Sequence, residues 1–205
     1  YRRVFRAREY CEKYGISFQL ASVVEHHDFV DGGFDKLVRF MEDNKIRLSI
    51  NPLIPTGHAT SRKENLLTFE DVKKLNEVSM NSNFISTHLT NNFFGFGCPA
   101  GNSYLGVNAT GEIFPCFFIP VSLGSVNKIT LKEAWQKACQ SPLFKHKHKM
   151  CFAGVSREFI CKYMDPIFNF PKVPIPIENH PLYNEQLTGL PDLEISDPQK
   201  AIENF

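Results

Sequence analysis

The chain reads Gly97-Cys98-Pro99-Ala100-Gly101 near its middle and Pro115-Cys116-Phe117-Phe118-Ile119-Pro120 shortly afterwards. Twelve residues separate Cys98 from Gly111, and four more separate Gly111 from Cys116. Short apolar runs flank Asn108-Ala109-Thr110-Gly111, which predicts a β-hairpin whose turn uses the positive φ that glycine allows. Such a hairpin would carry the two thiols on the same side, one at each end. Two thiolates held together in this way are half of a metal or iron–sulfur site.

Further elements follow in an order that resembles a known family. Leu123-Gly124-Ser125-Val126 comes after the second cysteine, and Leu131-Lys132-Glu133-Ala134-Trp135 begins a helix with a Thr130–Glu133 capping box. Together with the cysteine spacing, these elements resemble the SPASM/twitch auxiliary-cluster domains at the C-terminus of many radical S-adenosylmethionine (SAM) enzymes. The resemblance covers residues 91 to about 165 well and residues 1–60 weakly.

The resemblance implies one auxiliary [4Fe–4S] cluster ligated by four cysteines, namely Cys98, Cys116, Cys151 and Cys161. The last two follow the helix, where the family places its third and fourth ligands, although the family often shows a more closely spaced pair there. Six cysteines are too few for the two clusters of the full SPASM version, so the chain resembles the twitch variant. If three thiolates ligate, one iron would be open to substrate.

Three alternatives remain open for these cysteines. They could be buried thiols in a Phe-rich core. They could hold zinc, although zinc motifs usually pair ligands two to four residues apart and no two cysteines here are that close. Disulfides are disfavoured, because six cysteines without a secretory signal are typical of a reducing compartment. We therefore expect a cytoplasmic protein.

Composition limits the class of protein further. The 205 residues are 42% hydrophobic and 13% aromatic, which is typical of a globular chain. A net charge of +1 gives no reason to expect a nucleic-acid or membrane partner. No apolar run is long enough to predict a membrane-spanning helix. The first residue is Tyr1 rather than methionine, so we expect a fragment of a longer protein.

Residues 1–60 predict helices that alternate with strands. Apolar residues recur at helical spacing over 1–14 and again after Asp31, and they alternate over 16–24 and 46–50. Short connections between these elements imply parallel strands and an α/β layer. This pattern is similar to the last two strand–helix units of a partial (βα)6 radical SAM barrel, followed by a small α+β SPASM/twitch domain.

The expected organisation has four segments. Residues 1–60 would be the C-terminal part of the barrel, and residues 61–90 a connecting helix that starts at Thr68 and Asp71. Residues 91–165 would form the cluster domain. Residues 166–205 hold seven of the thirteen prolines, which predicts an extended tail that wraps the body or is poorly ordered.

The resemblance places SAM contacts at the ends of the barrel strands. Ser22 and Glu25 loosely match a family strand that packs beside SAM, and Pro55-Thr56-Gly57 matches the Pro-x-Gly turn that ends the next strand. The expected cofactor-binding residues are therefore Glu25, Ser22, Pro55 and Gly57. An ordinary barrel strand and turn remains the alternative, although sites of such barrels do lie at the C-terminal strand ends.

Two further cysteines lie on predicted apolar helix faces. Cys11 shares a face with Val4 and Ala7, and Cys139 shares one with Leu131, Ala134, Trp135 and Ala138. Free cysteines on such faces are usually packed in the core. We therefore expect neither of them to ligate a metal.

The resemblance implies the C-terminal portion of a radical SAM enzyme. Its auxiliary cluster would transfer an electron or anchor a peptide or small-molecule substrate. The 205 residues lack the Cys-x3-Cys-x2-Cys motif that holds the SAM-cleaving cluster, so we expect no activity from them alone, and no catalytic residue is identified. In the full-length enzyme the resemblance implies SAM, a second [4Fe–4S] cluster and an electron donor such as flavodoxin or ferredoxin.

Two other classes of function remain as alternatives. One is a stand-alone iron–sulfur electron carrier, which is disfavoured because a carrier would need none of the barrel strands expected in residues 16–57. The other is a zinc-stabilised interaction module, which the identity of the bound metal would distinguish.

Overall fold

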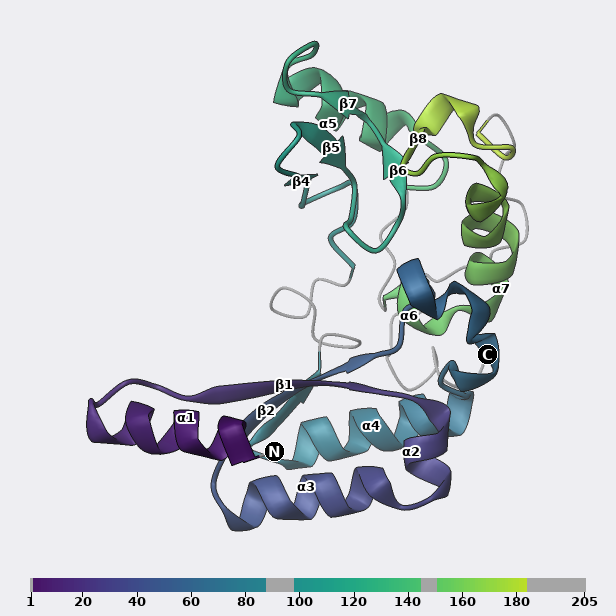
Figure 1. Cartoon of the computed structure of the whole chain (residues 1–205). Coiled ribbons are helices and arrows are strands. Elements are labelled where there is room, and N and C mark those ends of the chain that lie inside the picture. The colour runs from purple at the N-terminus through teal and green to yellow at the C-terminus, as the bar shows by residue number, and fades with distance from the viewer. Residues whose placement is uncertain (1, 88–97, 145–150, 184–205) are drawn as a thin grey trace.

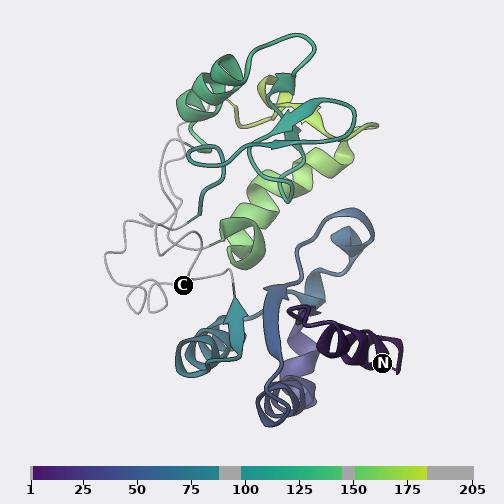
Figure 2. The ribbon, with the colours of Figure 1, turned by 90° about the vertical axis from the view of Figure 1, so that its left-hand side faces the viewer.

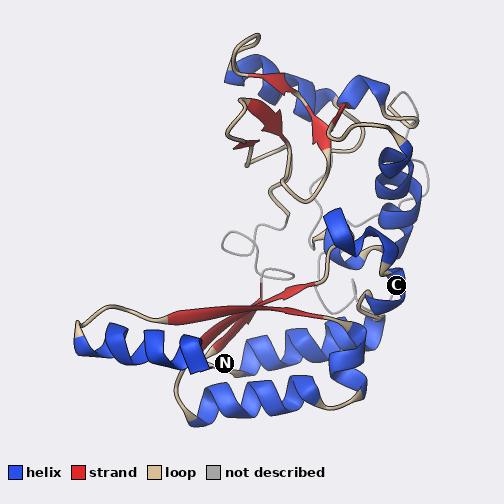
Figure 3. Cartoon of the chain, viewed as in Figure 1, coloured by secondary structure: helices blue, strands red, loops and turns tan. Residues whose placement is uncertain are grey.

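The computed structural model describes residues 2–87, 98–144 and 151–183, and shows two parts stacked one above the other (Figures 1 and 2). The N-terminal part is a three-stranded parallel sheet with helices, and the C-terminal part combines short strands with helices (Figure 3). Buried apolar side chains of both parts form one continuous hydrophobic cluster. The mixed α/β class, with a parallel sheet followed by a small antiparallel sheet, is confirmed. Within the described ranges, no helix has the length and apolar character needed to cross a bilayer.

The elements of the N-terminal part alternate along the chain, as predicted. They are α1 (Arg2–Lys13), β1 (Gln19–Val24), α2 (His26–Val30), α3 (Gly33–Asp43), β2 (Arg47–Pro52), the 3-10 turns η1 (Gly57–Ser61) and η2 (Lys63–Asn65), α4 (Phe69–Asn81) and β3 (Ile85–Thr87).

The sheet has one covered face and one open face. The strand order is β1-β2-β3, and successive side chains of each strand point to opposite faces. Val24, Leu48 and Ile50 are almost completely buried on the face that α3 and α4 cover (Figure 1). On the opposite face Val23 is 56% exposed, and no helix in the described part of the chain covers it. No described helix therefore covers the open face of the sheet.

The prediction that α1 packs through the face that carries Val4, Ala7 and Cys11 is wrong. Val4 is 40% exposed, and no residue of this helix is fully buried. The helix packs instead through Phe5, whose ring meets that of Phe40 of α3 edge-on with 5.5 Å between the centroids. Val4 and Phe5 are neighbours in sequence, and the position of α3 decides which of them turns inward.

The segment 61–90 contains more than the predicted connecting helix. The cap at Thr68 is confirmed, because its Oγ1 accepts the Asp71 N–H at 3.3 Å and its own N–H donates to Asp71 Oδ2 at 2.7 Å. After α4, however, β3 pairs in parallel with β2 and places Ile85 opposite Leu48. The segment therefore adds a third strand to the sheet, and three residues are too few to show the alternation that identifies a strand.

The C-terminal part begins with the hairpin and ends with a wrapped tail. Its elements are β4 (Gly106–Val107), β5 (Glu112–Phe114), β6 (Val121–Ser122), β7 (Gly124–Ser125), α5 (Leu131–Gln140), α6 (Phe152–Val155), α7 (Arg157–Phe159), the π-turn η3 (Ile160–Met164), η4 (Asp165–Asn169), β8 (Ile175–Pro176) and η5 (Ile177–Asn179).

The predicted hairpin is confirmed. β4 and β5 are antiparallel, with Val107 opposite Ile113. The Oδ1 atom of Asn108 closes the turn by accepting the N–H of Glu112 at 2.9 Å, and Gly111 has a φ of 85°, as such turns require. β7 adds a third strand beside β5. The hairpin is thus anchored on both sides of its turn.

The proline-rich tail wraps the C-terminal part as far as it is described. Ile175 of β8 pairs with Val121 of β6, and Ile167, Ile177 and His180 are buried. Residues 184–205 of the predicted tail lie outside the described residues.

His180 makes the stability of the tail depend on pH. Burial lowers the pKa of His180, and this effect is opposed in part by its hydrogen bond from Nε2 to the Tyr163 carbonyl at 2.8 Å, while Nδ1 accepts the Leu182 N–H at 3.1 Å. The unfolded state therefore binds a proton more readily than the folded state. We expect the free energy of unfolding to fall as pH drops below the ordinary histidine value of about 6.5.

The His180→Gln variant should lose this part of the pH dependence, because its amide does not titrate. Urea unfolding of both proteins at pH 7.5 and 5.5 measures the difference, which is at most about 1.4 kcal/mol per pH unit for one proton. Equal losses of stability in the two proteins would contradict the assignment to His180.

Candidate metal centre

Backbone hydrogen bonds bring Cys98 and Cys116 together at the base of the hairpin. The N–H of Gly101 donates to the carbonyl of Pro115 at 3.0 Å, so the loop after Cys98 is tied to the residue before Cys116. The same N–H also approaches the carbonyl of Tyr104 at 3.3 Å, which closes the loop on itself. Cys98 is buried and Cys116 is partly buried.

Cys151 reaches the same region from a third segment. It is buried at the start of α6, and its carbonyl accepts the N–H groups of Gly154 and Val155 at 3.0 Å each. Burial raises the pKa of Cys151, and the charges of Cys98 and Cys116 raise it further. Because charges act on one another strongly over short distances in the protein interior, the three thiols share one buried region.

Backbone N–H groups partly offset the burial of these thiols. Burial raises the pKa of Cys116, while the N–H groups of Phe118, which lies 3.5 Å from the sulfur, and of Ile119 lower it. Ala153 and Gly154 act on Cys151 in the same way. Such donors stabilise thiolates, and a cation that binds here displaces the thiol protons. The sulfurs of Cys116 and Cys151 therefore lie beside donors that favour the thiolate form.

Cys161, the fourth predicted ligand, is not brought to this group. It lies in the helical segment α7–η4, which buries Ile160 and Tyr163 on its inner side. Cys161 follows Ile160 by one position, so its side chain points in a different direction from the buried Ile160, and it is exposed. The pKa of Lys63 is raised by its hydrogen bond to Asp165 and also by the charge of Cys161. Cys161 therefore belongs to a different part of the surface.

Cys139 and Cys11 were both predicted to pack in the core. The prediction for Cys139 is wrong, and Cys11 is half-buried. α5 packs through the small side chains of Ala134 and Ala138, which are fully buried. Cys139 is exposed at the next position, and its S–H donates to the carbonyl of Gly101 at 3.7 Å. Neither cysteine joins the group of three.

In the described ranges, no three His, Cys, Asp or Glu side chains converge closely enough to hold a single metal ion. Cys98, Cys116 and Cys151 thus share a region without meeting at one point.

Comparison with models of protein families matches residues 98–154 to the SPASM iron–sulfur cluster-binding domain. Residues 98–154 are a SPASM domain. The match includes Cys98, Cys116 and Cys151 and ends before Cys161. SPASM domains bind iron–sulfur clusters and are typical of radical SAM enzymes. Searches of curated proteins and of solved structures give no match.

Two of the expected SAM-binding segments meet at the carboxyl edge of the sheet, on the side of the SPASM domain. Glu25 directly follows β1, and its Oε2 accepts from Arg62 Nη2 at 2.6 Å and from Asn65 Nδ2 at 2.8 Å. Arg62 and Asn65 follow the turn that contains Pro55 and Gly57. The sequence analysis missed both partners, because no local pattern marks a contact between residues 37 and 40 positions apart.

Ser22 lies on the other side of the sheet from the open face. It is opposite Ile50 on the face that the helices cover, and its hydroxyl donates to the carbonyl of Val23 at 3.3 Å. The open face carries Val23 and Asn51, which pair with each other across β1 and β2. The side chains on the open face therefore come from the positions next to Ser22.

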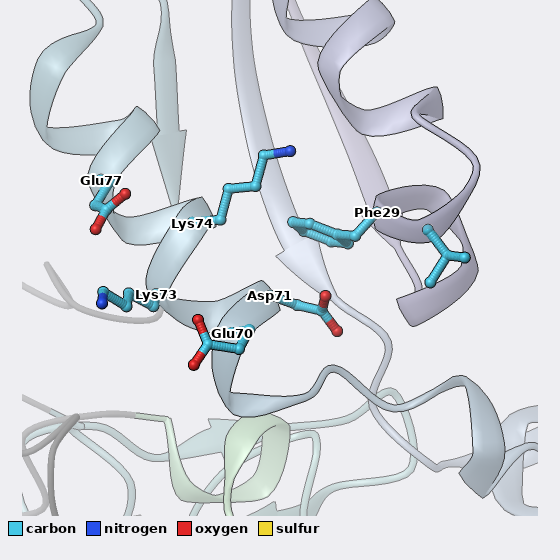
Figure 4. A pocket seen from close by; sticks show the side chains of 7 residues that line it. Phe29, Glu70, Asp71, Lys73, Lys74 and Glu77 are labelled. Atoms are coloured by element: carbon cyan, nitrogen blue, oxygen red, sulfur yellow. The ribbon is translucent and has the colours of Figure 1, made fainter.

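A separate groove lies between α2 and α4. It has a volume of ≈ 410 Å³, and Phe29, Glu70, Asp71, Lys73, Lys74 and Glu77 line it (Figure 4). Asp71 also accepts from His26, whose Nδ1 lies 2.7 Å from Oδ2, and so ties α2 to α4. Lys74 pairs with Asp35 at 2.7 Å. These contacts thus connect α2 and α3 to α4.

The burial of the three thiols predicts how fast each cysteine reacts. In metal-free protein at pH 8, we expect iodoacetamide to modify Cys139 and Cys161 at least roughly tenfold faster than Cys151, because the thiolate is the nucleophile and burial suppresses it. Peptide mass spectrometry measures each site, and the same reaction in urea is the control in which all sites become similar. Equal native rates at Cys151 and Cys161 would contradict the geometry.

Proposed function

We propose that the chain is the C-terminal portion of a radical SAM enzyme whose SPASM domain binds one auxiliary [4Fe–4S] cluster through Cys98, Cys116 and Cys151. The observation that carries this proposal is the convergence of three thiols from three separate segments on one buried region inside the matched domain. An iron–sulfur cluster is held by cysteine thiolates, and N–H donors beside the sulfurs tune it.

The sequence spacing of the cysteines favours a cluster over a zinc ion, because zinc motifs usually pair ligands two to four residues apart and no two cysteines here are that close. Thiolates around one zinc lie about 2.3 Å from the metal and therefore close to one another. In a cubane each thiolate ligates its own iron, so the sulfurs stand further apart. The charges of Cys98 and Cys116 act on Cys151, and no three such side chains of the described residues are placed to hold one metal ion, which is compatible with the second arrangement.

The sheet supports an enzyme rather than a stand-alone carrier. Its open face lies on the side of the SPASM domain (Figure 1), and Glu25 and the turn at Pro55 and Gly57 follow the carboxyl ends of β1 and β2. Glu25 would position Arg62 and Asn65 at this edge, where parallel sheets bind their ligands. When bound, the auxiliary cluster would supply electron transfer or substrate anchoring, and the substrate would be a peptide or a small molecule.

Cysteine replacement tests the proposed ligands. After anaerobic reconstitution, the chain should bind about four irons with matching sulfide and absorb broadly near ~400 nm. Cys98→Ala, Cys116→Ala and Cys151→Ala should each lose most of the iron and lower the stability of the loaded domain, because cluster binding is coupled to folding. Cys139→Ala and Cys161→Ala are the matched controls and should keep it. Loss of iron in the Cys161 variant, or stoichiometric zinc with no cluster, would overturn the assignment.

Cleavage of SAM tests the enzyme class. We expect the 205-residue chain with its cluster to release no 5′-deoxyadenosine from SAM under strong reductant, because it lacks the Cys-x3-Cys-x2-Cys motif. A longer natural protein that contains this chain and that motif should release it, since the cofactor performs the chemistry and the barrel positions it. Chromatography of both reactions measures the product. Turnover by the short chain would show that its own cluster generates the radical.

A further inference from the structure

The SPASM domain touches the parallel sheet at one very close contact. Gly154 of α6 is buried against the end of β2, and a Cβ atom at this position would lie 2.9 Å from Cγ of Pro52 and 3.6 Å from Cγ1 of Ile54. The same Cβ would lie 3.4 Å from the sulfur of Cys151. The backbone of Gly154 therefore fits between a rigid proline ring and a thiol of the metal centre.

The lack of room for a side chain, and not the backbone conformation, favours glycine at this position, because its φ is not in the left-handed region. The backbone conformation there is therefore compatible with alanine. The only obstacle to alanine is the steric overlap of its methyl group with the neighbouring atoms. A proline ring cannot rotate away as a flexible side chain can. The methyl group would have to displace α6 or Pro52, and a shift of α6 would move the Cys151 side chain that precedes it.

The sheet side of this contact is equally constrained. Pro52 is the last residue of β2 and pairs with Val24 of β1, and the N–H of the following Leu53 donates to the Val24 carbonyl at 3.0 Å. Pro52 and Ile54 are both buried. The end of β2 is therefore a fixed surface for α6, rather than a loop that could yield.

We propose that Gly154 and Pro52 form a joint through which the end of β2 sets the position of the Cys151 thiol relative to Cys98 and Cys116. Gly154 is a positioning residue: it acts on the metal centre through Cys151. The joint also holds the metal centre at a fixed separation from the carboxyl edge of the sheet. A displacement of β2 would therefore move the Cys151 thiol relative to the other two. The inference concerns the thiols themselves and holds whichever metal group they bind.

A double-mutant cycle tests the joint. The variants are Gly154→Ala, Pro52→Ala and the pair together, each in the full 205-residue chain. In metal-free protein we expect Gly154→Ala to raise the iodoacetamide labelling rate of Cys151 roughly tenfold, because overpacking forces the close contact open. Pro52→Ala alone should raise this rate by a smaller factor, because loss of the ring loosens the joint without overpacking it. The pair should fall back to the rate of Pro52→Ala, since the ring that the methyl group meets is gone.

A second measurement reports on the loaded centre. After anaerobic reconstitution, Gly154→Ala should bind the wild-type amount of iron but show a shifted electron paramagnetic resonance spectrum, and the pair should restore the spectrum. If Gly154→Ala simply unfolds, the labelling of Cys98 rises along with that of Cys151, and the pair must then recover the wild-type circular dichroism. A wild-type labelling rate in Gly154→Ala, or a pair as reactive or as unfolded as the single variant, would overturn the proposal.

Discussion

The burial of Cys98 and Cys151, with the partly buried Cys116 in the same region, is the constraint around which the C-terminal half is built. A buried thiol resists ionisation, and each neighbouring thiolate makes the next ionisation harder, as the raised pKa of Cys151 shows. The chain offsets part of this cost with backbone N–H groups beside Cys116 and Cys151. The remainder can be supplied by a bound cationic group, which stabilises thiolates directly. Folding and loading of the SPASM domain are therefore expected to be linked.

The scaffold that holds the thiols is made of backbone contacts more than of side-chain packing. The hairpin between Cys98 and Cys116 is closed at its tip by Asn108 and at its base by the hydrogen bond between Gly101 and Pro115. Cys151 instead depends on α6, which rests on the end of β2. Two of the three cysteines thus belong to a local unit, and the position of the third depends on the contact between α6 and the sheet.

Polar side chains of the sheet lie at its carboxyl edge, which is also where α6 contacts β2. Glu25 organises Arg62 and Asn65 at the carboxyl edge, and the open face carries Asn51 beside Val23. Because α6 sits directly on β2, the metal centre and this edge are parts of one continuous core. A cofactor or substrate at the edge would therefore lie on the side of the SPASM domain, which is the arrangement that an auxiliary cluster needs.

Patterns within one element were readable from the amino-acid order. The turn at Gly111, the caps at Thr68 and Thr130 and the parallel α/β layer follow from local propensity and periodicity, which depend on neighbours in sequence. Contacts between distant elements were not. Cys161 follows the helix, where the family places its fourth ligand, but packing of Ile160 and Tyr163 turned it to solvent. Ser22 and Cys139 were likewise placed by the strand or helix face that the neighbouring layer happened to cover, and β3 was too short to carry a pattern of its own. The tertiary fold settled these positions, because a side chain's direction is set by whichever face of its element becomes buried.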